Sequence, residues 1–156
     1  METRLAAKDD ARTLATLHAE SFGPAAWTLD QVSESLLLKT TLALVAEYKG
    51  AAYGFIMCQV VEEDAEILTI CVSPASRRSG VGQTLLEAAI ESLRKRKTRN
   101  LFLEVAEDNV AAKGLYEKAG FCVAGRREKY YKREGYFANA LRMSLDLQGH
   151  NNAWLR

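Results

Sequence analysis

The sequence predicts an α/β protein with a mixed, mostly antiparallel central sheet of about seven strands flanked by about four helices. Two observations carry this prediction. Three strand-like runs, at residues 41–46, 52–61 and 66–72, follow one another with only short turns between them, which is typical of an antiparallel meander. A strand, a helix and another strand then occupy residues 66–105, and such a crossover joins parallel strands.

One short strand and two helices precede the meander. Residues 3–7 read as a strand, and Asp9 or Asp10 can cap a helix that ends before Gly23-Pro24. Thr28 and Gln31 then form a capping-box pattern, in which each side chain bonds the other residue's backbone N–H. The second helix should therefore start there and run to about residue 38.

The elements after the meander alternate between helices and strands. One amphipathic helix spans about residues 81–96, and its apolar positions fall on one face: Val81, Leu85, Ala89 and Leu93. The remaining elements are a strand at 101–105, a helix at 109–119 that stops at Gly120, and strands at 121–128 and 138–147. We expect one domain over residues 1–147 and a C-terminal tail over 148–156, polar apart from Trp154 and Leu155.

Composition excludes several classes of protein. The chain has 156 residues and a formal net charge of +1, so no global charge favours nucleic acid or a membrane surface. No run approaches the roughly 20 apolar residues of a membrane span, and no secretory signal opens the chain, so we expect a cytoplasmic protein. We expect a monomer or a weak dimer.

Cysteines and histidines give no metal or hydrolase pattern. Cys58, Cys71 and Cys122 lack metal-site or redox spacing and lie in apolar runs, so we interpret them as small buried hydrophobic residues. The two histidines, His18 and His150, have no ligand partners at metal spacing, and a Ser-His-Asp hydrolase is equally disfavoured. We predict no metal.

The most informative segment is the hexapeptide Arg77-Arg78-Ser79-Gly80-Val81-Gly82, between a strand and a helix. Backbone N–H groups at a helix N-terminus lack internal partners and can bind an anion, and glycines let a ligand approach closely. A nucleotide P-loop is excluded because it ends in Gly-Lys-Ser/Thr, whereas Gly82 is followed by Gln83-Thr84. A dinucleotide-binding fingerprint is excluded because Leu85 occupies the position of its third glycine. An ordinary glycine-bearing helix start remains the alternative.

A second motif gives this loop its meaning. Asn109, Ala112, Leu115 and Tyr116 open a helix that closes at Gly120-Phe121. Together with Arg77-x-x-Gly80-x-Gly82, this resembles the GNAT family of acetyl-CoA-dependent N-acetyltransferases, most strongly over residues 65–131. Within the family, the chain looks most like the bacterial branch that acetylates the N-terminal alanine of ribosomal proteins. Ile70-Cys71-Val72 before the loop, Leu103-Glu104-Val105, and Arg126-Arg127 followed by Tyr130-Tyr131 carry that likeness.

The resemblance implies acetyl-CoA as the acetyl donor. Its pyrophosphate would bind the loop, with the donor-binding residues Arg77, Arg78, Ser79, Gly80, Val81, Gly82 and Gln83. A backbone N–H from Ile70, Cys71 or Val72 would stabilise the thioester carbonyl, and Asn109 would contact the coenzyme arm. From its position alone, Asn109 is equally an N-cap.

Acetyl transfer to an amine needs a base for the ammonium and a proton for the departing thiolate. Alternation along residues 101–105 places Phe102 and Glu104 on one face near the carboxyl end of a strand, and the resemblance makes Glu104 the general base. On the helix after Asn109, Ala112, Leu115 and Ala119 should form the apolar face with Tyr116 at its flank. The resemblance makes Tyr116 the general acid.

The acceptor is less readable. Tyr130 and Tyr131 fall between the last two predicted strands, where the resemblance implies contact with a substrate N-terminus; exposed hairpin aromatics are the alternative. The basic residues around them suit either an acidic partner or a solvated hairpin. We expect a protein N-terminus as acceptor. The first alternative is an enzyme of the same family that acetylates another amine, such as a lysine, a polyamine or another small molecule. The second alternative is a non-catalytic acyl-CoA-binding module. No direct nucleic-acid binding is expected.

Overall fold

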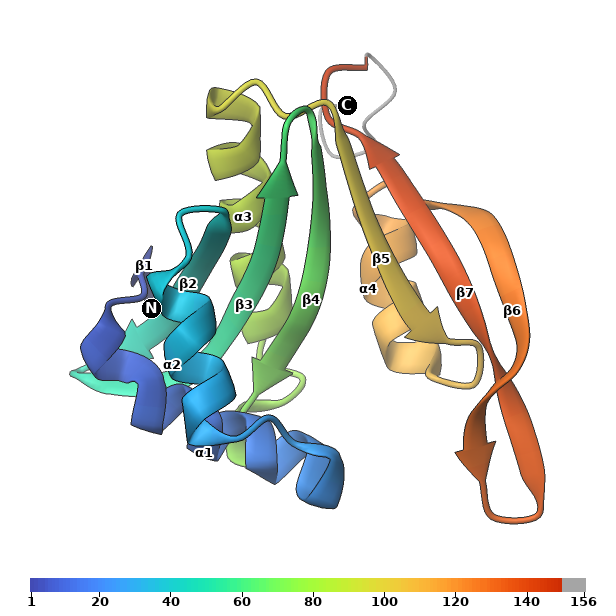
Figure 1. Cartoon of the computed structure of the whole chain (residues 1–156), viewed down its shortest axis with the longest axis horizontal. Coiled ribbons are helices and arrows are strands. Elements are labelled where there is room, and N and C mark those ends of the chain that lie inside the picture. Colours follow the sequence, from blue (N-terminus) through green and yellow to red (C-terminus); the bar gives the residue numbers. More distant parts are fainter. Residues whose placement is uncertain (150–156) are drawn as a thin grey trace.

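A mixed seven-stranded sheet forms the centre of the molecule, and its strand order is β1-β2-β3-β4-β5-β7-β6 (Figure 1). The computed structural model describes residues 1–149. The strands are β1 (Glu2–Leu5), β2 (Thr41–Tyr48), β3 (Ala51–Val61), β4 (Asp64–Val72), β5 (Asn100–Ala106), β6 (Cys122–Arg133) and β7 (Tyr136–Asp146). The helices are α1 (Ala11–Phe22), α2 (Leu29–Leu37), α3 (Val81–Lys95) and α4 (Val110–Lys118). Among the strands of the described residues, only β4 and β5 pair in parallel, which confirms the predicted fold class.

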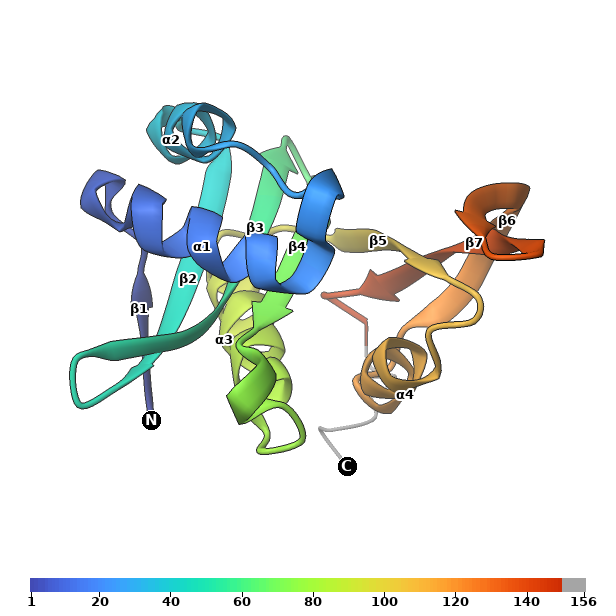
Figure 2. The same cartoon turned by 90° about the horizontal axis from the view of Figure 1, so that it is seen from below.

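Helices cover the two faces of the sheet unequally. α1 and α2 lie on one face, over β2 to β4, whereas α3 and α4 lie on the other (Figure 2). The predicted apolar face of α3 is confirmed, because Val81, Leu85, Ala89 and Leu93 are all buried against the sheet. On the α1 and α2 side, the β5–β7–β6 part of the sheet carries no helix (Figure 2).

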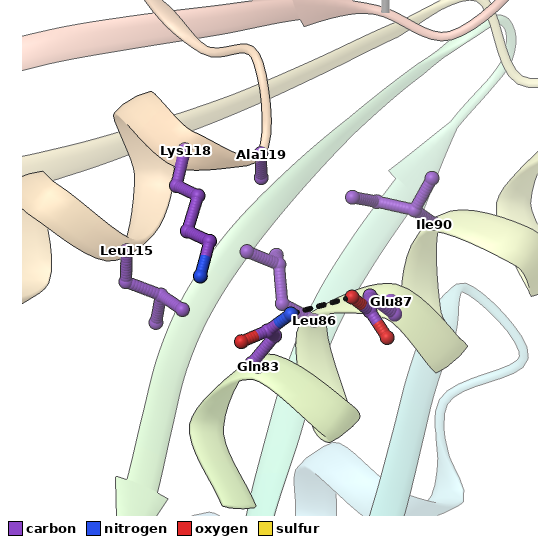
Figure 3. A pocket seen from close by; sticks show the side chains of 7 residues that line it. All are labelled: Gln83, Leu86, Glu87, Ile90, Leu115, Lys118 and Ala119. Atoms are coloured by element: carbon purple, nitrogen blue, oxygen red, sulfur yellow. Dashed lines mark hydrogen bonds between the residues drawn. The ribbon is translucent and has the colours of Figure 1, made fainter. Parts of the chain in front are cut away.

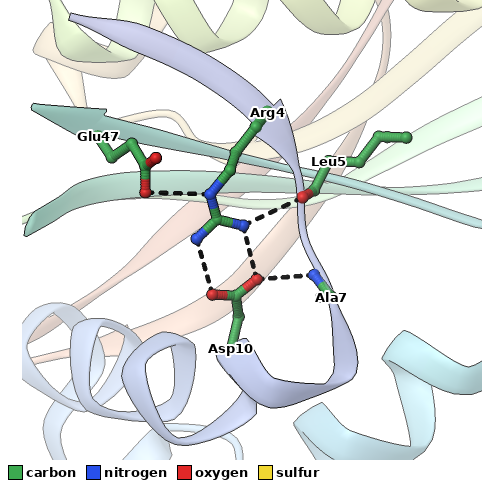
Figure 4. Close-up of polar contacts among 5 residues, drawn as sticks. All are labelled: Arg4, Leu5, Ala7, Asp10 and Glu47. Carbon is green, nitrogen blue, oxygen red and sulfur yellow. Dashed lines mark hydrogen bonds and ion pairs between the residues drawn. The ribbon is translucent and has the colours of Figure 1, made fainter. Parts of the chain in front are cut away.

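The first two helices begin differently from each other. Thr28 and Gln31 form the predicted capping box, with backbone-to-side-chain distances of 3.1 and 2.9 Å. Asp10 does not cap α1. Its carboxylate accepts instead from Arg4 at 2.8 and 2.9 Å and from the Ala7 N–H at 2.7 Å (Figure 4). A bidentate charged pair is stronger than a neutral cap, and it ties β1 to the start of α1.

A β-bulge separates β4 from β5. Their pairing stops after Glu66 and Phe102, although β4 continues to Val72 and β5 to Ala106. In the ladder with β3, Thr69 and Ile67 have successive partners while Leu68 has none. A bulge bends its strand and increases the local twist. The two strands therefore diverge at their carboxyl ends (Figure 1).

The last hairpin is longer than predicted. Tyr130 and Tyr131 lie within β6, not in a connection, and the turn falls at residues 134–135. A register shift between Arg127 and Tyr131 interrupts the alternation that a sequence pattern needs. β6 is also an edge strand, so Cys122 is exposed, contrary to prediction, whereas Cys58 and Cys71 are buried as expected.

Two predictions concern the chain as a whole. Within residues 1–149, no helix is both long enough and apolar enough to cross a membrane. Of the predicted C-terminal tail, His150, Trp154 and Leu155 lie outside the described residues.

Candidate active site

The glycine loop presents backbone donors at the start of α3. Gly80 adopts the left-handed conformation, with φ of 86° and ψ of 5°, which L side chains rarely adopt. The first bond within the helix joins Thr84 N–H to Gly80 O at 3.0 Å. The N–H groups of Val81, Gly82 and Gln83 therefore have no acceptor inside the helix and are available to an anion.

The arginines of the loop differ in position. Arg77 donates to Val72 O and to Ser21 Oγ, both at 3.4 Å, so it holds the loop against the end of β4 and against α1. Arg78 is exposed and has a φ of 64°, and the Ser79 hydroxyl donates to Ser76 O. Arg78 thus adds an accessible positive charge to the loop.

The end of β4 carries backbone N–H groups that no strand partner uses. Ser73 N–H donates to Tyr53 O at 2.8 Å, and antiparallel alternation then turns the peptide groups of Ile70 and Val72 away from β3. Because β5 has diverged at this level, no strand meets them. The Cys71 side chain points to the opposite face, into the core under α1 and α2.

A pocket of about 250 Å³ separates α3 from α4 (Figure 3). Four of its lining residues are apolar and three are polar. The lining residues are Gln83, Leu86, Glu87, Ile90, Leu115, Lys118 and Ala119. Leu115 also faces Gly82, whose Cβ position would lie 3.5 Å from Leu115 Cδ2. The pocket thus begins at the glycine loop.

Asn109 and Tyr116 of the second motif lie at the N-cap of α4 and within α4, respectively. The Asn109 side chain accepts from Ala112 N–H at 3.2 Å, so it is an N-cap of this helix. Tyr116 is the buried residue of α4, not a flanking one, and packs edge-on against Phe121 at 5.7 Å between ring centroids. Burial raises the pKa of Tyr116 to about 12, with Cys58 and Cys71 nearby. The phenol therefore stays protonated near neutral pH.

Glu104 lies on the uncovered face of the sheet. Leu101, Leu103 and Val105 are buried in the core, as the alternation predicted, while Phe102 and Glu104 point the other way. The Glu104 side chain is 19% exposed, and its Oε1 pairs with Arg127 Nη2 at 2.9 Å. No local sequence pattern could indicate this pair, because its members are 23 positions apart on different strands.

Tyr130 and Tyr131 of β6 differ in their burial and in their position relative to the Glu104 carboxylate. Tyr131 is half-buried, and burial together with the charge of Glu104 raises the pKa of its phenol. Tyr130 is exposed and meets Tyr131 edge-on, with ring centroids 5.0 Å apart. The Arg127 guanidinium lies 5.2 Å from the Tyr130 ring. The structure thus brings Tyr131 near Glu104 and places Tyr130 behind Arg127.

Acidic residues in β5 and directly after it form ion pairs with arginines of β6. Arg126 pairs with Glu107 and Arg133 with Asp108, each at 2.9 Å, in addition to the Arg127–Glu104 pair. Of the two alternatives left open, an acidic partner or a solvated hairpin, these three arginines have acidic partners, and those partners belong to the same chain.

The arrangement combines an anion-binding loop, free backbone donors, a partly buried carboxylate and a buried phenol. Within residues 1–149, no group of three or more His, Cys, Asp or Glu side chains could hold a metal ion. Such a set can bind a phosphate-bearing donor, accept a proton from one reactant and give one to another.

Comparison with known proteins points the same way. The family model described as the acetyltransferase (GNAT) family matches residues 11–121. The ribosomal protein bS18-alanine N-acetyltransferase of Salmonella typhimurium is 35% identical over 136 residues, covering 80% of this chain and 90% of the relative.

Two solved structures share the fold over nearly the whole chain. The ribosomal-protein-S18-alanine N-acetyltransferase from Escherichia coli has a TM-score of 0.84 at 30% identity, covering 96% of this chain and 97% of that one. The ribosomal-protein-alanine N-acetyltransferase from Brucella melitensis has a TM-score of 0.79 at 25% identity, covering 94% and 99%.

Proposed function

The chain belongs to the GNAT acetyltransferase family, and on that premise we propose that it transfers acetyl from acetyl-CoA to a protein N-terminus. The acceptor we propose is the α-amine of an N-terminal alanine, foremost that of a ribosomal protein, because similar chains carry that activity in their names. Three observations support the proposal: the open glycine loop at the start of α3, the partly buried Glu104 on β5, whose pairing with β4 ends early, and the buried Tyr116 of α4.

Donor binding rests on backbone groups. The free N–H groups of Val81, Gly82 and Gln83 would hold the pyrophosphate, with Arg78 adding positive charge. The pocket between α3 and α4 begins at this loop and would receive a further part of the donor. The N–H of Ile70 or Val72 would donate to the thioester carbonyl as negative charge develops on its oxygen.

Proton transfer requires a base and an acid. Glu104 would remove the proton from the acceptor ammonium, directly or through a water, so that nitrogen gains the lone pair that attacks the thioester carbon. Tyr116 would donate to the sulfur as the carbon–sulfur bond breaks. Its pKa of about 12 keeps the donor proton in place throughout the neutral range.

Thiol release tests the proposal. The protein is mixed with acetyl-CoA and with peptides that differ in their first residues, alongside lysine, polyamines and other small amines. We expect turnover of N-terminal alanine peptides and its loss in Glu104→Gln at neutral pH, with unfolding unchanged. Good turnover of a small amine and none of any alanine peptide would refute the proposed acceptor, whereas full activity of Glu104→Gln would refute the base.

A further inference from the structure

One cation already occupies the carboxylate that the acceptor must reach. Resting on the function proposed above, we propose that the Arg127 guanidinium holds, in the free protein, the place at Glu104 that the acceptor's ammonium group takes. Acceptor binding would then exchange one cation for another. Arg127 is thereby a specificity-determining residue of the acceptor site and not part of the proton transfer.

The charges around Glu104 single out Arg127. Arg142 is the register partner of Glu104 on the neighbouring strand, yet its guanidinium lies over the Phe102 ring, 4.5 Å from the centroid. Among residues 1–149, the ion pair of Glu104 is with Arg127 alone, at 2.9 Å. That contact uses Oε1, so an ammonium group that binds this oxygen must displace the guanidinium.

A bulge in β6 follows directly after Arg127 and determines which residues surround its side chain. Arg127 lies opposite Ala140 and Tyr131 opposite Ala138, so two extra residues bulge from β6 between them. Asn139 accepts from Lys129 N–H at 2.9 Å and donates to Glu107 at 2.7 Å, which anchors the bulge to the end of β5. The Tyr130 ring then lies beside the guanidinium, at 5.2 Å.

Exposure makes the exchange feasible. The Arg127 side chain is 60% exposed, against 19% for Glu104, so the guanidinium can leave into water while the carboxylate stays in place. An α-amine has a reference pKa of about 7.7–8.0 and reaches the site largely as a cation at neutral pH. It can therefore replace Arg127 without leaving Glu104 unpaired.

A thermodynamic double-mutant cycle tests the exchange: the peptide amine and the Arg127 side chain are removed singly and together, and the binding affinities are compared. The probes are a hexapeptide with N-terminal alanine and its des-amino analogue, in which hydrogen replaces the amine, both titrated calorimetrically into the protein with coenzyme A bound. Arg127→Gln should increase the preference for the amine-bearing peptide, by up to about fivefold because an exposed ion pair is weak. Arg127→Lys should stay near the wild type.

The matched control is Arg126→Gln, which removes the neighbouring arginine and its pair with Glu107 but leaves Glu104 paired. We expect it to keep the wild-type preference. An unchanged preference in Arg127→Gln, or equal weakening of both peptides, would overturn the exchange.

Thiol release by the wild type separates this inference from its premise. Turnover of the alanine peptide combined with an unchanged preference would refute the role of Arg127 alone. Absence of both binding and turnover would refute the proposed function, and this inference with it.

Discussion

Gly54 on β3 is the position where one added methyl group should disturb both the core and the donor site. A Cβ there would lie 2.6 Å from Cys71 O, 3.2 Å from Val81 Cγ1 and 3.3 Å from Leu85 Cδ1. The first neighbour is backbone of β4 and cannot rotate away. Overpacking of this kind costs about 1–3 kcal/mol, so Gly54→Ala should lower the urea midpoint of unfolding by roughly 1 M.

The same displacement should reach the donor. Cys71 lies between Ile70 and Val72, whose N–H groups we propose as donors to the thioester carbonyl, and Val81 opens α3 at the glycine loop. Gly54→Ala should therefore also raise the KM for acetyl-CoA. KM and kcat are measured by thiol release at temperatures where the variant is folded.

Gly82→Ala is the matched control. Its Cβ would lie 3.5 Å from Leu115 Cδ2 and 3.8 Å from Val72 Cγ2, which is ordinary contact. Alanine is the better helix former, by up to about 1 kcal/mol, so this variant should be as stable as the wild type or more so. A Gly54→Ala protein with wild-type stability, or a Gly82→Ala protein less stable than Gly54→Ala, would refute the reasoning.

Three further predictions follow from single residues. Gly80→Ala forces alanine into a left-handed conformation at about 1–2 kcal/mol, so the KM for acetyl-CoA should rise about 5–30-fold, and an unchanged KM would refute the loop assignment. Tyr116→Phe should lower kcat about 100-fold or more in thiol release while unfolding stays near that of the wild type. Burial lowers the pKa of His18, so its contribution to stability is complete above about pH 6.5 and is lost as pH falls through the lower folded-state value. Urea unfolding at pH 7 and pH 5 should show a smaller acid loss in His18→Gln, and equal losses would contradict this.

Sequence patterns predicted what depends on neighbours along the chain. The meander, the apolar face of α3 and the Thr28 capping box follow from local periodicity and from side chains three or four residues apart. The burial of Tyr116 was not predictable, because α4 is only partly covered by the sheet and its amphipathicity is weak. The predicted position of Tyr130 and Tyr131, in the connection between the last two strands, was wrong because the bulge after Arg127 breaks the alternation of buried and exposed residues along β6.

Ion pairs between residues distant in the sequence could not be predicted from local sequence patterns. The basic residues of β6 could be recognised as a cluster, but their acidic partners belong to another strand and the loop that follows it. Whether a charge is solvated or paired depends on the register of β5, β7 and β6, which no local pattern fixes.

The bulge at Leu68 connects fold and chemistry. Before it, Ala65 and Ile67 face the core under α3; after it, Ile70 and Val72 face that core, so the alternation has shifted by one residue. The shift keeps apolar side chains inside while the strand bends away from β5. A regular strand would continue its pairing with β5, and that pairing would use the N–H groups that we propose for the thioester oxygen. The irregularity in the sheet therefore leaves the N–H groups of Ile70 and Val72 without a strand partner, and these are the donors that we propose for the thioester oxygen.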